Sequence, residues 1–279
     1  YYAVHTPLMT KPELQARYEA KREALAPVEG PRFAPEGPRE NRQVQDHPVY
    51  AGMVQSVDES VGRILSRLEE LGVAGHTAVV LMSDNGGLST SEGSPTSNLP
   101  LRAGKGWLYE GGIREPMIVK WPGVTAGGSV CHEPVTSTDF YPTLLEMAGL
   151  PAKPEQHVDG VSLVPLLEQK GALDRNELFW HYPHYGNQGT TPSGAIRQGD
   201  LKLIEYFEDG RVELFDLSQD LGEEQDLAAA RPDKVEELRE KLERWRQDVA
   251  AAMPPGPNPE FDPDAWAEWH RRQREGSRD

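Results

Sequence analysis

The chain has 279 residues, a formal net charge of −16 and a single cysteine. This length allows a full hydrophobic core plus a smaller module. The strong negative charge would repel polyanions, so we expect no nucleic-acid partner. One cysteine excludes a disulfide within the chain. No apolar run reaches the roughly 18 to 20 residues of a membrane helix, so we expect no membrane segment.

The first 72 residues predict two helices separated by a loop. Residues 11–25 have helix-forming composition, and the prolines and glycines of residues 27–38 predict an irregular connection. Apolar residues at helical spacing over 53–71 predict a second helix, with Gly72 as its stop.

Two short apolar runs follow, at residues 78–82 and 117–119, and both are typical of buried strands. Because the first run comes straight after a helix, we expect an αβ unit. Residues 88–103 are rich in Ser, Thr, Gly and Pro and predict a loop over the site. Thr138 is the expected N-cap of a helix that continues through Met147.

A second module is expected from about residue 173. Four short extended runs predict an antiparallel sheet, and Glu-Asp-Gly at 208–210 predicts the turn that joins the last two. These runs are residues 178–180, 194–197, 201–206 and 212–215. An apolar stripe on a charged segment then predicts a helix that covers the sheet. The stripe consists of Val235, Leu238, Leu242, Trp245 and Val249. Residues 254–279 are expected to be a surface-packed arm or partly disordered.

The sequence Ser-Asp-Asn-Gly-Gly at 83–87 stands at the carboxyl end of the first predicted strand. Open α/β sheets place their sites at such ends. Asp84 and Asn85 offer a carboxylate and an amide oxygen, and this oxygen-only donor set suits calcium better than zinc. The alternative is an ordinary turn in which the Asp and Asn side chains hydrogen-bond to nearby backbone.

Lys105 lies between two glycines, which allow backbone and ammonium to approach a small anion closely. A P-loop would require Ser or Thr after the Gly-Lys pair, so Gly106 and Trp107 exclude that motif. A solvated loop lysine is the alternative. His5 follows a short apolar stretch and is expected at a strand end. An imidazole at this place can donate a hydrogen bond or assist a leaving group. A structural histidine is the alternative.

Seven short motifs follow one another in a fixed order. They are Tyr-Ala-Val-His-Thr-Pro at 2–7, Ser-Asp-Asn-Gly at 83–86, Gly-Lys-Gly at 104–106, Tyr-Glu-Gly-Gly-Ile-Arg-Glu-Pro at 109–116, Asp-Phe-Tyr-Pro-Thr-Leu-Leu at 139–145, Asp-Gly-Val-Ser-Leu at 159–163 and Glu-Leu-Phe-Asp-Leu at 213–217. This series resembles the sulfatase family, within the alkaline-phosphatase-like superfamily. Several ordered motifs are far more specific than any one of them.

The resemblance implies an α/β fold, the sandwich of alkaline-phosphatase-like proteins and sulfatases. Residues 1–172 would form the carboxyl-terminal part of its main sheet domain. Residues 173–253 would form the small antiparallel-sheet subdomain covered by a helix, and residues 254–279 a tail.

The resemblance also implies a function, the calcium-dependent hydrolysis of a sulfate ester. Asp84 and Asn85 would be ligands of one calcium ion, Lys105 would bind the sulfate, and His5 would contact a sulfate oxygen or the leaving group. Calcium takes about six to eight oxygen ligands, so two residues make an incomplete site.

The chain departs from the family at the nucleophile, a formylglycine made from the first residue of a Cys/Ser-x-Pro/Ala-x-Arg motif. Cys131 lacks the proline and arginine at that spacing. Ser193 satisfies the short pattern, but it belongs to a predicted strand of the antiparallel sheet. The family's early Asp-Asp pair is absent too. We therefore expect the formylglycine in an amino-terminal part outside this chain, and no activity from this chain alone.

Substrate contacts are expected from an aromatic and imidazole cluster at residues 181–186, in which His181, His184 and Tyr185 can stack on or hydrogen-bond to a sugar. A packed aromatic cluster is the alternative. Glu110 and Arg114 are expected to form ion pairs that shape the Lys105 loop rather than to act in catalysis.

The expected partner is a sulfate ester, with sulfated carbohydrates as one open class, and the oligomeric state is not predicted. The resemblance implies a periplasmic or secreted location. Two other functions stay open: a phosphate or phosphonate ester hydrolase of the same superfamily, and a truncated, non-catalytic binding domain. Asn85 favours the sulfatase over the former, which would tend to carry more His and Asp metal ligands.

Overall fold

The computed structural model describes residues 1–266, 268 and 272. The chain divides into two compact units. The first unit contains residues 1–61, 83–115 and 177–279, and the second contains residues 62–82 and 116–176. The domain limits expected from the sequence stay a prediction. Within the described residues, every helix is too short or too polar to cross a membrane.

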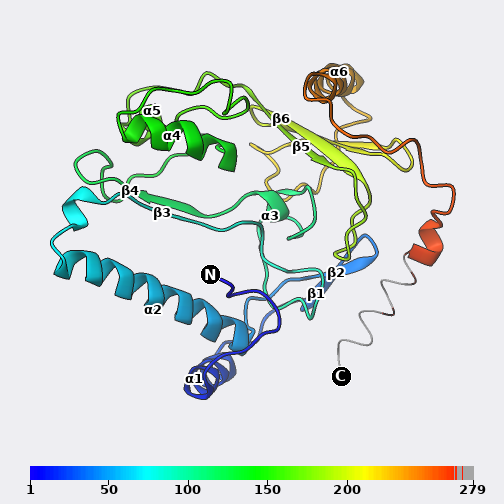
Figure 1. Cartoon of the computed structure of the whole chain (residues 1–279). Coiled ribbons are helices and arrows are strands. Elements are labelled where there is room, and N and C mark those ends of the chain that lie inside the picture. The colour runs from blue at the N-terminus through cyan, green and yellow to red at the C-terminus, as the bar shows by residue number, and fades with distance from the viewer. Residues whose placement is uncertain (267, 269–271, 273–279) are drawn as a thin grey trace. The chain divides into compact units, whose positions relative to one another are not determined.

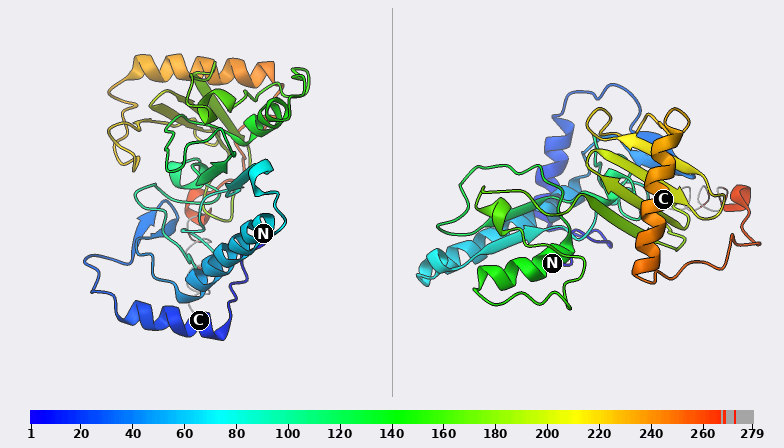
Figure 2. Two further views of the ribbon diagram at one scale, coloured as in Figure 1. Left: turned by 90° about the vertical axis from the view of Figure 1, so that its left-hand side faces the viewer. Right: turned by 90° about the horizontal axis from the view of Figure 1, so that it is seen from above.

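A four-stranded antiparallel sheet dominates the first unit, in the order β5 (Glu177–Tyr182), β6 (Ser193–Gln198), β7 (Leu201–Tyr206) and β8 (Val212–Asp216). The helix α6 (Pro232–Asp248) lies across this sheet (Figures 1 and 2). Leu238 and Leu242 from the helix are fully buried against Ile196, Leu203 and Leu214 from the strands. The predicted sheet, its last turn and its covering helix are therefore confirmed.

The amino-terminal part of the first unit contains the predicted helix, α1 (Pro12–Glu23), followed by a hairpin that the sequence did not predict. In place of a fully irregular loop, β1 (Phe33–Glu36) pairs with β2 (Arg39–Arg42). Gly37 in the connecting turn has φ +52, a conformation that glycine adopts without strain. The many prolines obscured this hairpin, because proline weakens any strand pattern.

The second predicted helix is α2 (Pro48–Glu70), and Gly72 follows it with φ +69. After the short 3-10 helix η1 (Ala74–His76) comes β3 (Val79–Met82), which pairs antiparallel with β4 (Met117–Lys120). The expectation that both strands are buried is wrong. Val80 and Leu81 are each 39% exposed and Ile118 is 64% exposed, because a two-stranded ribbon shields its own side chains poorly.

Contrary to the prediction from the sequence, Thr138 does not cap the helix after β4. Thr136 is the N-cap of the 3-10 turn η2 (Ser137–Asp139), where it forms a capping box with Asp139, and Asp139 is the N-cap of the α-helix that follows. That helix is α4 (Phe140–Met147). Asp139 is fully buried and pairs with Arg175 at 2.6 Å. This ion pair fixes the start of α4 in the second unit, which also contains the short helix α5 (Val164–Leu167).

Candidate functional site

The Asp84 turn, residues 83–87, follows directly after the carboxyl end of β3, as the sequence predicted. Asp84 is exposed and Asn85 is half-buried. Their side chains accept no hydrogen bond from the described residues, so the alternative of a self-bonded Asx turn does not apply. Ser83 Oγ instead donates to the backbone oxygen of Asn85 at 3.0 Å. The side-chain oxygens of the turn are thus available to a ligand.

Glycines allow the turn to lie directly against a second segment. Gly86 N–H donates to the backbone oxygen of Gly112 at 3.2 Å. A Cβ on Gly86 would lie 1.8 Å from the backbone oxygen of Gly111, a distance that no side chain tolerates. Gly111 and Gly112 belong to the short helix α3 (Glu110–Ile113). The glycine pairs of the sequence therefore mark a close approach of backbones.

The Lys105 loop, residues 103–106, also packs against this turn. Lys105 N–H donates to the backbone oxygen of Gly87 at 3.2 Å. A Cβ on Gly104 would lie 2.1 Å from that same oxygen. The Lys105 side chain is half-buried, and its ammonium has no hydrogen-bond or ion-pair partner in the described part of the chain. The structure thus brings Lys105 and the Asp84 turn together.

A second carboxyl group, that of Glu115, stands close to Asp84. Burial raises the pKa of Glu115 to about 8, and the negative charge of Asp84 adds to the shift. The Oε1 atom of Glu115 is buried without a hydrogen-bond partner among the residues described. The sequence analysis missed this residue, although it lies in the Gly-Gly-Ile-Arg-Glu-Pro motif.

The donors at the turn fit part of a calcium site. Asp84 and Asn85 supply unengaged oxygens, the ligand type that a hard cation takes. The raised pKa of the nearby Glu115 favours its neutral form, so this carboxyl adds little negative charge until it loses its proton. No group of three or more His, Cys, Asp or Glu side chains within the described residues is arranged to hold a metal. At this turn, the side chains of the described residues therefore offer fewer oxygens than the roughly six to eight that calcium takes.

Glu110 is buried in an ion network that anchors α3. Its Oε1 lies 3.1 Å from the Lys202 ammonium, and Lys202 lies 2.8 Å from Glu223. All three side chains are at most 1% exposed. Glu223 also accepts a hydrogen bond from the backbone N–H of Glu110 at 2.6 Å, and burial raises the pKa of its carboxyl.

Arg114 and Arg197 extend this network, at 3.7 Å and 3.5 Å from Glu110. The expected ion pairing of Glu110 with Arg114 is therefore confirmed. Lys202 and Glu223 could not be predicted from local sequence, because they lie about 90 residues or more from Glu110 along the chain.

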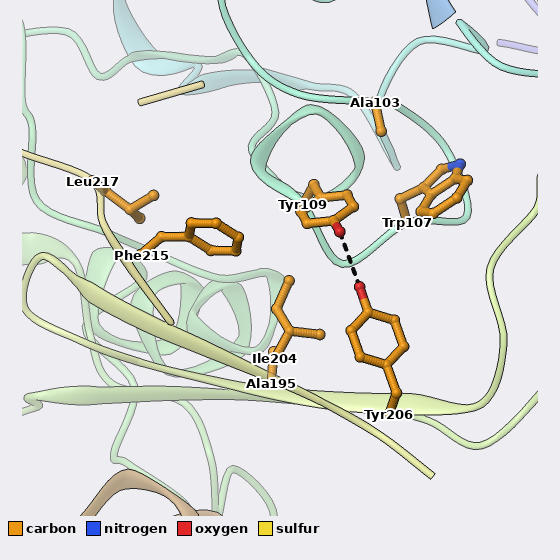
Figure 3. Close-up of a cluster of buried hydrophobic side chains, with 8 residues drawn as sticks. All are labelled: Ala103, Trp107, Tyr109, Ala195, Ile204, Tyr206, Phe215 and Leu217. Atoms are coloured by element: carbon orange, nitrogen blue, oxygen red, sulfur yellow. Dashed lines mark hydrogen bonds between the residues drawn. The ribbon is translucent and has the colours of Figure 1, made fainter. Parts of the chain in front are cut away.

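An aromatic cluster joins the Lys105 loop to the four-stranded sheet. Tyr109 donates to Glu213 at 2.7 Å, and Tyr206 donates to Tyr109 at 3.1 Å (Figure 3). Burial raises the pKa of both tyrosines, so both hydroxyls stay protonated. Trp107 stacks on Tyr109 with ring centroids 5.8 Å apart. These contacts fix the segment that follows Lys105.

His5 lies in a turn and not at a strand end, since residues 1–10 form no strand. Its Nδ1 is 2.8 Å from the carbonyl oxygen of Thr6, which can only accept, so Nδ1 carries the hydrogen. Thr6 donates to Glu92 at 2.7 Å, and Asn187 donates to the other oxygen of Glu92 at 3.2 Å. Glu92 therefore connects the His5 segment to the β5–β6 loop. In the described structure, no hydrogen bond or ion pair joins the His5 side chain to Lys105.

The three predicted substrate-contact residues divide between a strand and a loop. His181 lies within β5, not on the loop, and its Nε2 is 2.9 Å from the backbone oxygen of Ala252. His184 is exposed and packs edge-on against Tyr182 at 5.4 Å. Tyr185 donates to Glu208 and its ring packs against two tail residues, Phe261 and Trp266.

These contacts show that at least this part of the tail packs on the first unit. The prediction for residues 267, 269–271 and 273–279 lies outside the described residues. Because His181 and Tyr185 have intramolecular partners, their role in substrate contact stays a prediction.

Ser193, which matches the short nucleophile motif, lies inside the sheet. Ser193 is 1% exposed at the start of β6, which pairs with both β5 and β7. This position fits the interpretation that Ser193 is no nucleophile. Cys131 is an exposed free thiol in the second unit.

Comparison with known proteins identifies the family. The family model Sulfatase matches residues 1–150, and the model N-sulphoglucosamine sulphohydrolase, C-terminal, matches residues 103–248. Each match covers more than half of the chain. The chain belongs to the sulfatase family. The resemblance noted in the motifs and the α/β sulfatase fold are thereby confirmed.

The relatives of this sulfatase chain include a protein from Formosa agariphila, named Sulfatase, which is 38% identical over 268 residues. That match covers 88% of this chain and 45% of the relative. Among solved structures, Ps i-CgsB in complex with k-i-k-neocarrahexaose has a TM-score of 0.72 at 26% identity, over 99% of this chain and 54% of that one.

A second solved structure is BT4656 in complex with its substrate D-Glucosamine-2-N, 6-O-disulfate. It has a TM-score of 0.61 at 28% identity, over 72% of this chain and 41% of that one. The sulfatase chain thus spans about half the length of the proteins that it matches.

Proposed function

We propose that this chain provides the sulfate-binding part and half of the calcium site of a sulfuric ester hydrolase. The observation that carries the proposal is the direct packing of the Lys105 loop on the Asp84 turn, through the Lys105 N–H to Gly87 bond of 3.2 Å. This bond brings the backbone of the Lys105 loop against the Asp84 turn, which supports a site in which the Lys105 ammonium and the oxygens of Asp84 and Asn85 would face one ligand. A sulfate ester combines the negative charge that Lys105 would bind with the oxygens that a cation would bind.

Each residue has a separate role in the proposed site. Asp84 and Asn85 would hold the calcium ion, which when bound supplies Lewis-acid polarisation at sulfur-bound oxygen. Lys105 would stabilise negative charge on the transferring group. Because the Nδ1 hydrogen of His5 is engaged by Thr6, the ring can donate from Nε2 only as imidazolium. His5 would then protonate the leaving oxygen or bind a sulfate oxygen.

The nucleophile would come from outside residues 1–279, in the form of formylglycine. Two observations support this part of the proposal: Ser193 is buried in a sheet, and Cys131 lacks the required neighbours. The exposed apolar side chains of β3 and β4 also suit further strands from that source. A non-catalytic binding domain is the alternative if no such segment exists.

Replacement of Lys105 by Ala tests the sulfate site. In an active protein that contains residues 1–279, kcat is expected to fall by about two to three orders of magnitude, as for the loss of one preorganised donor to developing charge. In the chain itself, Lys105→Ala should abolish the binding of inorganic sulfate measured by calorimetry. Lys120→Ala, at an exposed site on β4, is the matched control. If Lys105→Ala changed neither kcat nor sulfate binding, the assigned role would be wrong.

We propose a sulfated carbohydrate as the substrate. In its support, one structural neighbour is described as bound to a disulfated glucosamine substrate and another to an oligosaccharide. His184 and Tyr185, on the loop connected through Asn187 and Glu92 to the His5 segment, would contact the sugar.

The combined change His184→Ala and Tyr185→Ala tests this assignment in an active protein that contains the chain. The kcat/KM ratio between a sulfated glycan and a small aryl sulfate should fall by a factor that corresponds to about 1 to 3 kcal/mol, the loss of stacking and one or two hydrogen bonds. Phe261→Ala is the control, because it removes packing against Tyr185 but leaves the loop side chains. Equal losses on both substrates would show that the cluster is structural.

A further inference from the structure

We propose that Asn98 is a positioning residue that holds the Asp84 turn and the Lys105 loop in register. The side-chain amide nitrogen of Asn98 donates to the backbone oxygen of Gly87 at 2.8 Å and to that of Ala103 at 2.8 Å. These two acceptors stand two residues after Asn85 and two residues before Lys105. The importance of the two segments rests on the proposed function, whereas the bridge itself does not.

The chemistry of the two acceptors fixes the orientation of the amide. Both are carbonyl oxygens, which only accept, so the NH₂ group of Asn98 must face both of them. An NH₂ group has two hydrogens, and each is used once. Aspartate has the same shape but no such hydrogens, so it would turn an oxygen toward two other oxygens. Asparagine is therefore specifically suited to this place.

Two glycines leave room for the amide. A Cβ on Gly87 would lie 2.5 Å from Asn98 Oδ1, and a Cβ on Gly104 would lie 2.7 Å from Asn98 Nδ2. Both distances are shorter than a side chain allows. The Asn98 amide thus fills a space that exists only because both segments carry glycine at this point.

The backbone before Lys105 is held in a conformation that needs support. Ala103 has φ +56 and is fully buried, and residues other than glycine rarely adopt such a φ. Its carbonyl oxygen accepts hydrogen bonds from both Asn98 and Ser89 Oγ, the latter at 2.8 Å. Asn98 therefore helps to hold the loop in the one conformation that directs Lys105 N–H to Gly87.

The backbone oxygen of Gly87 is shared by three hydrogen bonds. It accepts from Asn98 Nδ2, from Ser89 N–H at 2.9 Å and from Lys105 N–H at 3.2 Å. The Lys105 bond is the longest of the three. When the Asn98 bridge is lost, the Lys105 N–H bond should open first.

Amide hydrogen exchange of the full chain, followed by NMR, tests the proposal through the variants Asn98→Asp and Asn98→Ala. Exchange at Lys105 N–H should become at least tenfold faster in both variants, while Leu203 N–H in the buried centre of the sheet should be unchanged. Thr143→Val is the matched control, since Thr143 makes two buried hydrogen bonds in the second unit, with Asp139 and Leu163. This control should leave exchange at Lys105 unchanged.

Inorganic sulfate is the second probe. Sulfate should shift the Lys105 amide resonance of the wild-type chain. At the same sulfate concentration, this shift should be at least tenfold smaller in both Asn98 variants. Unchanged exchange at Lys105, or an equal acceleration at Lys105 and Leu203 in both variants, would overturn the proposal. If sulfate did not shift the Lys105 amide resonance of the wild-type chain, the proposed function would be contradicted. The exchange comparison would still decide the role of Asn98.

Discussion

The purified 279-residue chain should give no detectable hydrolysis of an aryl sulfate such as para-nitrophenyl sulfate, with or without added calcium. Turnover requires a nucleophile, and the one serine at the expected spacing, Ser193, is 1% exposed inside a sheet. Cys131 lies in a sequence without the proline and arginine of the formylglycine motif. In the proposed site Lys105 would stabilise charge and His5 would move a proton, and neither would attack sulfur.

Calcium binding by the chain should be weak for a related reason. Asp84 and Asn85 would supply at most three side-chain oxygens, whereas calcium takes about six to eight. Calorimetric titration should give no submicromolar affinity. The Formosa agariphila relative, assayed under the same conditions, serves as the reference for a protein of about twice the length. Measurable turnover by the chain that disappears on addition of a chelator would disprove the assignment of the nucleophile to another segment.

The sequence allowed the four-stranded sheet and α6 to be predicted because their signals are local. The alternating run at 201–206, the Glu-Asp-Gly turn and the stripe from Val235 to Trp245 each lie within a few residues of one another. The exposure of Val80 and Ile118 could not be predicted in this way. An apolar run indicates a strand, but what covers the strand depends on segments far away in the sequence.

The candidate site shows the same difference between features with a local sequence signal and features that depend on distant segments. The motifs indicated Asp84, Asn85 and Lys105, and glycines indicated a close approach of backbones. The residues that hold these segments, Asn98 and Lys202, carry no motif of their own. Their partners are determined by the path of the loops, which sequence spacing does not encode.

Lys202→Met should lower the free energy of unfolding by about 3 to 5 kcal/mol, the usual cost of removing one partner from a buried ion pair. The Lys202 ammonium is fully buried between Glu110 and Glu223, at 3.1 Å and 2.8 Å. Without it, two carboxylates would share a buried site, and the cations that the described structure places near Glu110 are Arg197 and Arg114, at 3.5 Å and 3.7 Å. Chemical denaturation followed by tryptophan fluorescence measures the change.

Lys234→Met is the matched control, because Lys234 pairs with Glu237 at the surface of α6. The same chemical change there should cost about 0 to 1 kcal/mol. Adding Glu110→Gln and Glu223→Gln to Lys202→Met should recover part of the loss. The glutamine at position 223 can still accept from the backbone N–H of residue 110, and the unpaired charges are gone. If Lys202→Met were no more destabilising than Lys234→Met, the buried ion network would not be what anchors α3 to the sheet.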